Sequence, residues 1–468
     1  MSSGLTKKVH KMNYNPALDK ATKNGNNRSS RNHPFDADEM EERQMNEQWA
    51  AYQDSKAFAD RVATLYGAGE DVRALQKARY GKLVERFEKR FGAQKGGLCF
   101  FSAPGRTEIG GNHTDHNNGR VLAAAVNLDT IACVSRTDDN AIVVDSEGFA
   151  PITVKLDNLD VREKDFGTTL ALIRGTAGVM QEMGYKVGGF RATISSSVLR
   201  GSGLSSSAAF EVLIAAILDG LYNGFVVDAK TRAVIAQKVE NVYFGKPCGL
   251  MDQMASSVGG MVTIDFKEKD AKVEAIACDF AAKGYALCVV NTGGDHGDLT
   301  DDYAAIRKEM EAVAAHFGKH VLRETVESRI GEVRRACGDR AVLRALHYYD
   351  ENARVLEQAA AIRGGDLPAF FDAVNRSGES SWKLLQNVYA RPTEEQMAMG
   401  IELSRRFLHG DGAQRVHGGG FAGTIQAYVP LARLADYKKL MEDAFGAGSC
   451  TALMVRPEGA VMMPMEAE

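Results

Sequence analysis

The stretch that decides the fold is Ser196–Ala209, SSVLRGSGLSSSAA, in a chain of 468 residues. It follows a β-branched segment, residues 190–195, and precedes an apolar one, residues 207–221, so the pattern predicts strand, loop and helix. Gly201 and Gly203 let the backbone adopt positive φ and approach a ligand closely. Ser205, Ser206 and Ser207 place hydroxyls and free N–H groups at the first helical turn. This order is typical of a phosphate cradle, although an ordinary serine N-cap is the alternative.

Composition excludes several classes of protein. With 44% hydrophobic and 25% charged residues the chain is globular, and its length predicts two domains, since one core seldom grows past about 250–300 residues. The net charge of -4 gives no general attraction for nucleic acid or membrane. No apolar run approaches the roughly 20 residues of a membrane helix. Seven scattered cysteines without a Cys-x-x-Cys or a signal peptide predict reduced thiols and a cytoplasmic location.

The N-terminal region differs from the rest. The first 33 residues hold seven Lys or Arg and one acid, Asp19, so residues 1–35 are predicted to form a disordered basic arm. A transit peptide is disfavoured because no apolar stripe is present. Any nucleic-acid role would rest on this arm alone. Residues 36–82 are predicted to form a helical extension on the main body, because large apolar side chains recur at helical spacing: Trp49, Tyr52, Phe58, Val62, Leu65 and Tyr66.

Beyond residue 100 the pattern alternates between strands and helices. Strands are predicted at 121–134, 141–145, 190–195, 261–266, 285–291, 424–429 and 451–455, and helices at 168–183, 207–221, 231–244 and 432–445, with further helices dominating from residue 301 to 424. The fold class is therefore α/β plus α+β. No Gly-x-x-x-x-Gly-Lys-[Ser/Thr] motif and no solenoid repeat occurs.

Three more islands accompany the glycine loop: Ser102–Gly119 (SAPGRTEIGGNHTDHNNG), Cys248–Gln253 (CGLMDQ) and Gly418–Gly423 (GGGFAG). In this order and spacing the four islands resemble the GHMP kinase superfamily and, within it, the galactokinases. The resemblance implies an N-terminal domain like domain 2 of ribosomal protein S5, over residues 83–284, and a ferredoxin-like C-terminal domain, over residues 285–468. The active site would lie between them. Residues before about 81 have no counterpart in that family.

The resemblance also implies how ATP and its metal are held. The residues of the glycine loop would bind the triphosphate: Gly201, Ser202, Gly203, Leu204, Ser205, Ser206 and Ser207. Ser207 and Glu240 would bind Mg²⁺, which needs hard oxygen ligands. The alternative for Glu240 is a solvated helix carboxylate near Lys238. The interval between Glu240 and Asp252 equals the family's, which favours the metal role.

Asp252 and Arg106 match the family's catalytic pair. Asp252 lies in what is predicted to be a loop, where an acid is otherwise a turn or N-cap residue. By resemblance it is the general base that accepts the proton of a sugar hydroxyl. Arg106 would face it and the transferred phosphoryl group, and a guanidinium at that distance lowers the pKa of a carboxyl by about 1–3 units. The base would then be weak but ionised, so its position matters most.

Asn112, His113, Thr114 and Asp115 match the family's sugar-binding segment, usually Glu-His-Thr-Asp followed by Tyr. Two positions depart, because Asn112 replaces the usual Glu and His116 the usual Tyr. His113 and His116 as a zinc pair is a weak alternative without further ligands.

Two further features belong to this part of the resemblance. Tyr303 matches a tyrosine that packs against the sugar. In the loop Gly418–Gly423, Ala422 replaces a family glycine, which requires negative φ there.

The expected function is that of an ATP-dependent sugar 1-kinase of the galactokinase type, which converts galactose and MgATP to galactose 1-phosphate and ADP. The Asn112 departure leaves open an anomeric kinase for an N-acetylhexosamine, arabinose or a uronic acid. A regulator that binds sugar and ATP without catalysis is the third alternative. The presence of Arg106, Ser207, Glu240 and Asp252 argues against it.

Overall fold

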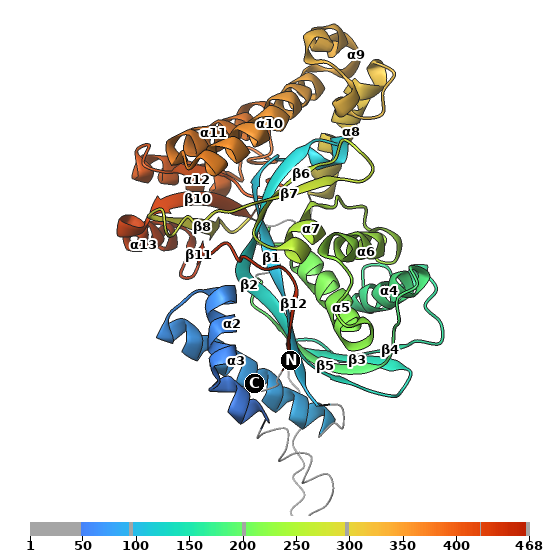
Figure 1. Ribbon diagram of the computed structural model, residues 1–468. Coiled ribbons are helices and arrows are strands. Elements are labelled where there is room, and N and C mark those ends of the chain that lie inside the picture. The colour runs from blue at the N-terminus through green and yellow to red at the C-terminus, as the bar shows by residue number, and fades with distance from the viewer. Residues whose placement is uncertain (1–47, 93–96, 199–202, 295–298, 422, 465–468) are drawn as a thin grey trace, which may run out of the picture.

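The computed structural model describes residues 48–92, 97–198, 203–294, 299–421 and 423–464 (Figure 1). The helices are α2 Lys56–Tyr66, α3 Glu70–Phe91, α4 Thr169–Glu182, α5 Ser206–Asn223, α6 Ala229–Val242, α7 Met251–Val258, α8 Thr300–His316, α9 Arg334–Cys337, α10 Asp339–Gly364, α11 Leu367–Ser380, α12 Gln396–Leu408 and α13 Leu434–Phe445. The strands are β1 Cys99–Gly110, β2 Arg120–Arg136, β3 Ala141–Ser146, β4 Ile152–Lys155, β5 Phe190–Ser196, β6 Met261–Asp265, β7 Lys272–Ile276, β8 Tyr285–Asn291, β9 Ala413–Val416, β10 Thr424–Pro430, β11 Cys450–Leu453 and β12 Val461–Pro464.

The larger sheet has the strand order β12-β1-β2-β5-β3-β4, with β6 and β7 joined to the other end of β2. Successive residues of β1 point to opposite faces of a sheet. Phe101 packs among α4, α5 and α6, whereas Phe100 packs under α2 and α3. Both faces are therefore covered, which is why β1 and β2 are buried along nearly their whole length.

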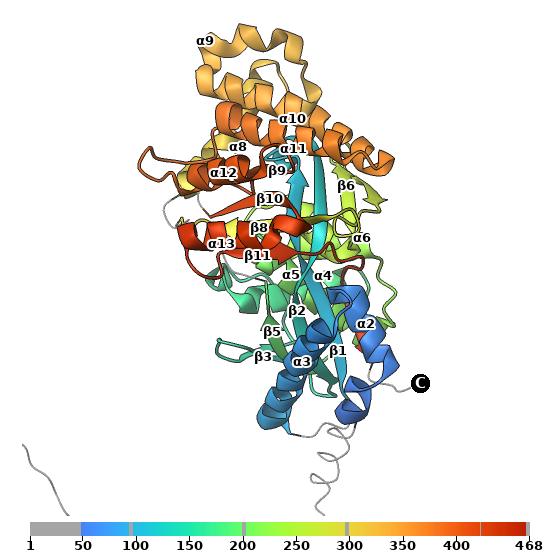
Figure 2. The same cartoon turned by 90° about the vertical axis from the view of Figure 1, so that its left-hand side faces the viewer.

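The smaller sheet has the antiparallel order β11-β8-β10-β9. Val290 and Ile425 pack against α12 and α13 on one face, and Val289 and Tyr428 pack against α10 and α11 on the other. Helices α8 to α12 are inserted between β8 and β9 and extend beyond the sheet, as Figures 1 and 2 show. The two sheets and the helical extension agree with the predicted fold class.

Most predicted elements are confirmed to within a few residues. Strand β1, however, is not predicted by the sequence pattern. The Pro104-Gly105 dipeptide within it hides the strand from a sequence pattern. The structure accommodates this dipeptide at a β-bulge, where the register with β2 shifts between Pro104 and Arg106. The residues that precede Arg106 are therefore fixed by strand pairing.

Two domain boundaries also differ from the prediction. Helix α3 continues to Phe91, so a boundary after residue 82 would cut it. The chain also returns after the smaller sheet, because β12 pairs antiparallel with β1. The last strand thus belongs to the larger sheet. The arm predicted for residues 1–35 lies outside the described residues.

Candidate active site

Arg106 and Asp252 form the centre of the candidate site. Arg106 projects from β1, and its Nε and Nη2 atoms both lie 2.7 Å from Asp252 Oδ1. Asp252 does not lie in a loop, as the sequence predicts, but in the first turn of α7. Burial alone would raise the pKa of Asp252, but Arg106 and a hydrogen bond from Ser205 hold that pKa below its usual range. The carboxylate is therefore ionised, and 32% of its side chain is exposed.

The glycine loop reaches this pair through its second half. Ser205 occupies the N-cap position of α5 in the left-handed conformation, with φ 55°, yet its hydroxyl donates to Asp252 and caps no helix N–H. The first N–H groups of α5 are thus free of a capping side chain from Ser205, as an anion site requires. Arg106 contacts the loop through its backbone N, which donates to Leu204 O at 3.0 Å, and its guanidinium donates to Gly203 O. Gly201 and Ser202 lie outside the described residues.

A group of buried polar side chains lies behind the glycine loop. Gln253 Nε2 donates to Glu240 Oε2 at 2.7 Å and to Glu211 Oε2 at 3.2 Å. Glu211 follows Ser207 by four residues in α5, so the two share one helix face. Burial raises the pKa of Glu211 and of Glu240. Glu240 is therefore not the solvated carboxylate of the alternative interpretation, since only 5% of its side chain is exposed.

Glu211 is a residue that sequence reasoning missed. It is fully buried, and its Oε1 has no hydrogen-bond partner in the described part of the chain. The signal was an acid within the mostly apolar run of residues 208–218, one turn after Ser207.

Asp115 and His113 bring the predicted sugar segment to the same place. A Cβ atom on Gly249 would lie 2.1 Å from Asp115 Oδ2, so only glycine permits the carboxylate to approach the segment before α7 this closely. Burial raises the pKa of Asp115, and the negative charge of Asp252 adds to this effect. His113 adopts positive φ and its Nε2 lies 2.9 Å from Gly419 O. Two carboxylates thus lie near one another beside an arginine.

Tyr303 and the glycines after β9 complete the site from the C-terminal domain. The Tyr303 hydroxyl donates to Gly420 O at 2.7 Å, and a Cβ atom on Gly419 would lie 2.7 Å from the Tyr303 ring. A Cβ atom on Gly418 would lie 3.8 Å from Gly203 Cα, so this loop touches the second half of the glycine loop. Ala422 lies outside the described residues.

Asn112 departs from the expectation that it contacts the sugar. Its side chain has no exposed surface. Its amide nitrogen donates to Glu108 Oε1 at 3.0 Å and to Gly418 O at 2.7 Å. Its amide oxygen accepts from Asn387 at 2.8 Å and from Ser381 at 3.3 Å. In this conformation the hydrogen-bonding groups of the side chain are used by the protein itself.

Thr114 is likewise buried, and its hydroxyl lies 2.9 Å from Gly111 O and 2.6 Å from Arg120 O. These contacts close the loop that carries Asp115. The side chains of Asn112 and Thr114 are therefore buried within the predicted sugar segment and hydrogen-bonded to the protein itself.

The buried pair Glu108 and Arg415 was also missed. Arg415 Nη2 donates to Glu108 Oε1 at 2.7 Å, and neither side chain is more than 5% exposed. The pair joins β1 to β9 next to Asn112. Its two members are 307 positions apart, so no local pattern could reveal it.

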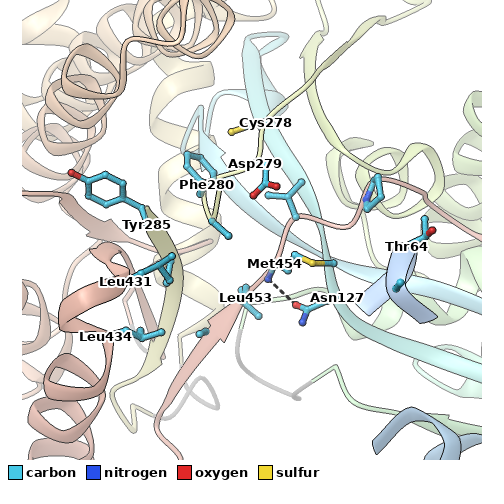
Figure 3. A pocket seen from close by; sticks show the side chains of 16 residues that line it. Thr64, Asn127, Cys278, Asp279, Phe280, Tyr285, Leu431, Leu434, Leu453 and Met454 are labelled. Atoms are coloured by element: carbon cyan, nitrogen blue, oxygen red, sulfur yellow. Dashed lines mark hydrogen bonds between the residues drawn. The ribbon is translucent and has the colours of Figure 1, made fainter. Parts of the chain in front are cut away.

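A cavity of about 550 Å³ lies elsewhere, between α2, β2 and the smaller sheet (Figure 3). Its walls are mostly apolar, and it is crossed at one edge by the hydrogen bond from Met454 N to Asn127 Oδ1. Neither Arg106 nor Asp252 lines it. Among the described residues no group of three or more His, Cys, Asp or Glu side chains is arranged to hold a metal, and no helix is long and apolar enough to span a membrane.

Comparison with known proteins identifies the family. The galactokinase galactose-binding signature matches residues 85–136, and the GHMP kinase N-terminal domain matches residues 171–260. A galactokinase from Streptomyces coelicolor is 32% identical over 377 residues, which cover 80% of this chain and 94% of that protein. This chain belongs to the galactokinase family. A galactokinase from Mannheimia succiniciproducens is 29% identical, over 73% of this chain and 88% of its own length.

Solved structures show the fold. The Lactococcus lactis galactokinase complexed with galactose superposes with a TM-score of 0.72 at 22% identity, and covers 82% of this chain and 99% of that one. The Methanococcus jannaschii mevalonate kinase gives a TM-score of 0.56 at 16% identity, over 77% and 99% of the two chains. The fold is therefore that of the GHMP kinases. The signature covers Arg106 and Asp115, and the domain match covers Ser205, Glu240 and Asp252.

Proposed function

We propose that this protein is an ATP-dependent galactokinase, which transfers the γ-phosphoryl group of ATP to the anomeric hydroxyl of galactose. The observation that carries the proposal is the contact between Arg106, Asp252 and Ser205, where a base, a cation and the N-terminus of α5 meet. Phosphoryl transfer needs little else from a protein than aligned reactants and stabilised charge. Membership of the galactokinase family supports the choice of reaction.

Each residue has a role that its surroundings support. Asp252 accepts the proton of the sugar hydroxyl, and since Arg106 keeps it ionised, its contribution is chiefly position. Arg106 donates from one guanidinium to Asp252 and to the glycine loop, so it lies between the acceptor and the phosphates. It can stabilise charge that develops on the transferred group. Asp115 approaches Gly249, and His113 and Tyr303 both contact the Gly418–Gly423 loop; these side chains suit recognition of sugar hydroxyls.

A divalent cation fits beside the glycine loop. Ser207 offers a hydroxyl and Glu240 a carboxylate, which are the hard oxygen ligands that Mg²⁺ prefers, with water and phosphate completing its shell. Buried Glu211 follows Ser207 on the same helix face, and its Oε1 has no hydrogen-bond partner among the described residues, so a cation there would give that oxygen a partner. When bound, Mg²⁺ neutralises charge on the β- and γ-phosphates. Gln253 holds the Glu240 carboxylate in place.

The structure weakens the case for a different sugar. That case depended on Asn112 as a ligand-facing residue, and its side chain is buried and fully hydrogen-bonded. Galactose therefore remains the favoured acceptor. A regulator without catalysis would not need the Arg106–Asp252 pair.

The test is coupled ADP release against a panel of free monosaccharides. Galactose should give the highest kcat/KM. Asp252→Asn should lower turnover at least ~100-fold, the lower range for loss of a positioned base. Asp265→Asn is the matched control, because Asp265 also pairs with an arginine and is 25% exposed, but lies in β6. A higher kcat/KM for another sugar, or near-normal turnover in Asp252→Asn, would contradict the proposal.

A further inference from the structure

Asp129, in the middle of β2, is the centre of a buried charge network that joins the N-terminal extension to the larger sheet. Its side chain has no exposed surface. Tyr66, the last residue of α2, donates to Oδ2 at 2.5 Å, and Arg79 of α3 donates to Oδ1 at 2.5 Å. Ser102 of β1 donates to Oδ2 at 2.5 Å, and Arg456 lies 3.1 Å from the same oxygen. Two arginines and two hydroxyls thus surround one carboxylate.

This carboxylate is held in its ionised form. Burial would raise the pKa of Asp129, but Arg79 and Arg456 together hold it below the usual range. A buried carboxylate that loses one partner must move or be neutralised, since an unpaired buried charge is strongly unfavourable. Arg79, a residue of the extension, is the partner of Oδ1, so its loss would leave that oxygen unpaired and favour a shift of Asp129. Figures 1 and 2 show α2 and α3 lying against the lower part of β1 and β2.

The backbone of Asp129 in turn holds the segment before the glycine loop. Asp129 N donates to Ser197 Oγ at 3.0 Å, and Asp129 O accepts from Ser197 N at 2.9 Å and from Ser197 Oγ at 3.1 Å. The same carbonyl accepts from Arg79 Nη2 at 2.9 Å. Arg79 thus donates hydrogen bonds to both the carboxylate and the backbone carbonyl of Asp129. Ser197 is the fourth residue before Gly201, the first glycine of the loop.

A second contact leads from this segment to the catalytic pair. A Cβ atom on Gly105 would lie 3.1 Å from Val198 Cγ1 and 2.8 Å from Leu204 O, so β1 runs tightly between the two sides of the loop. Arg106 is the next residue. A shift of Ser197 and Val198 would therefore displace the glycine loop more than the sugar segment, because other elements anchor the sugar segment.

We propose that Arg79 and Tyr66 are positioning residues for the ATP-binding loop, and that they act through Asp129 and Ser197. The helical extension then contributes to ATP binding by fixing the position of the glycine loop. This inference rests on the proposed function, because it assumes that the loop after Ser197 binds ATP.

The test compares two arginines of α3. Arg79→Ala removes the hydrogen bonds to the carboxylate and the carbonyl of Asp129. Arg86→Ala is the matched control, because Arg86 also pairs with a buried acid of the larger sheet, Asp145 Oδ1 at 2.7 Å, but on β3, away from the loop. Arg79→Ala should raise the KM for ATP about three- to tenfold, as expected when a hydrogen-bonded partner is lost, with the KM for galactose changed less than about twofold. Arg86→Ala should leave both KM values within about twofold of wild type.

Tyr66→Phe is the milder second variant, since it removes one hydrogen bond and keeps the ring. It should raise the KM for ATP less than Arg79→Ala, and it decides the question if Arg79→Ala fails to fold. Unchanged KM for ATP in the folded variants, or equal changes for ATP and galactose or for Arg79 and Arg86, would overturn the inference. If instead wild type fails to phosphorylate galactose, the proposed function falls, which is a separate result.

Discussion

At the scale of single residues, the hydrogen-bond partners of Asn112 require an amide side chain at this position. Its amide nitrogen donates to a carboxylate, Glu108, and to a carbonyl, Gly418 O. Asn112→Asp would replace this donor by an acceptor and place a second acid against Glu108. We expect the free energy of unfolding to fall by roughly 2–4 kcal/mol, the range for a buried group left unpaired beside a like charge. Urea unfolding at pH 7 measures this.

A double variant provides the control for Asn112. Glu108→Gln combined with Asn112→Asp returns one amide and one carboxylate to the same two positions. It should be more stable than the sum of the two single changes predicts, since neighbours in one network are not additive. Additive losses would show that the Asn112–Glu108 contact contributes little.

Glu240 supports a prediction about magnesium. Glu240→Gln replaces a carboxylate ligand by a neutral amide, a poorer ligand for a hard cation. The concentration of Mg²⁺ at half-maximal rate should rise by about tenfold. We take the loss of one charged ligand to cost about as much free energy as the loss of one charge-assisted hydrogen bond. Glu182→Gln is the control. Glu182 is the last residue of α4, and it forms an exposed ion pair with Lys238 of α6. An unchanged Mg²⁺ titration in Glu240→Gln would mean that this carboxylate only supports Gln253.

At the scale of elements, α10 is tied to the sugar segment by a buried histidine. His347 Nε2 lies 2.9 Å from Asn112 O, and its Nδ1 lies 2.8 Å from Ser380 Oγ. Burial lowers the pKa of His347 from 6.5 to about 4, although Glu351 opposes this. The unfolded chain therefore binds a proton before the folded chain does. The stability due to neutral His347 is complete above pH 6.5 and is lost as the pH falls towards 4.

This sign gives a measurable pH dependence. Between pH 7 and pH 5 the wild type should lose about 2 kcal/mol of unfolding free energy through His347. His347→Gln cannot titrate and should lose correspondingly less, whereas His320→Gln, at an exposed position, should behave like wild type. Equal pH dependence of the wild type and His347→Gln would show that His347 is not responsible.

At the scale of the whole molecule, the C-terminal strand β12 forms one edge of the larger sheet and covers the edge of β1. β12 pairs with β1, and Val461 and Met463 pack with the aromatic side chains of the extension. Removal of residues 460–468 should expose the edge of β1, lower the melting temperature and promote association, because an unpaired edge is a template for pairing. Removal of residues 465–468 alone leaves β12 intact and should change neither. Melting curves and size-exclusion chromatography measure both effects.

The sequence by itself determined the features that depend on near neighbours. Ser205, Ser206 and Ser207 stand at the start of α5 as their spacing indicates, since the glycines before them and the apolar residues after them leave few other conformations. Motif order identified the family, and with it the pairing of Arg106 with Asp252. The strand β1 escaped because Pro104 and Gly105 imitate a turn, and only pairing with β2 shows that they form a bulge.

Only the tertiary structure decided which polar groups are buried and what satisfies them. Asn112 stands at the position of a predicted sugar ligand, yet its side chain donates to Gly418 O, 306 residues away. Arg79 of the extension pairs with Asp129 across 50 residues. Residue type fixes the hydrogen-bonding groups that a side chain offers, but not the partner that folding brings to it. A buried donor must find an acceptor somewhere in the fold, and that acceptor is supplied by packing between distant segments, which no local pattern records.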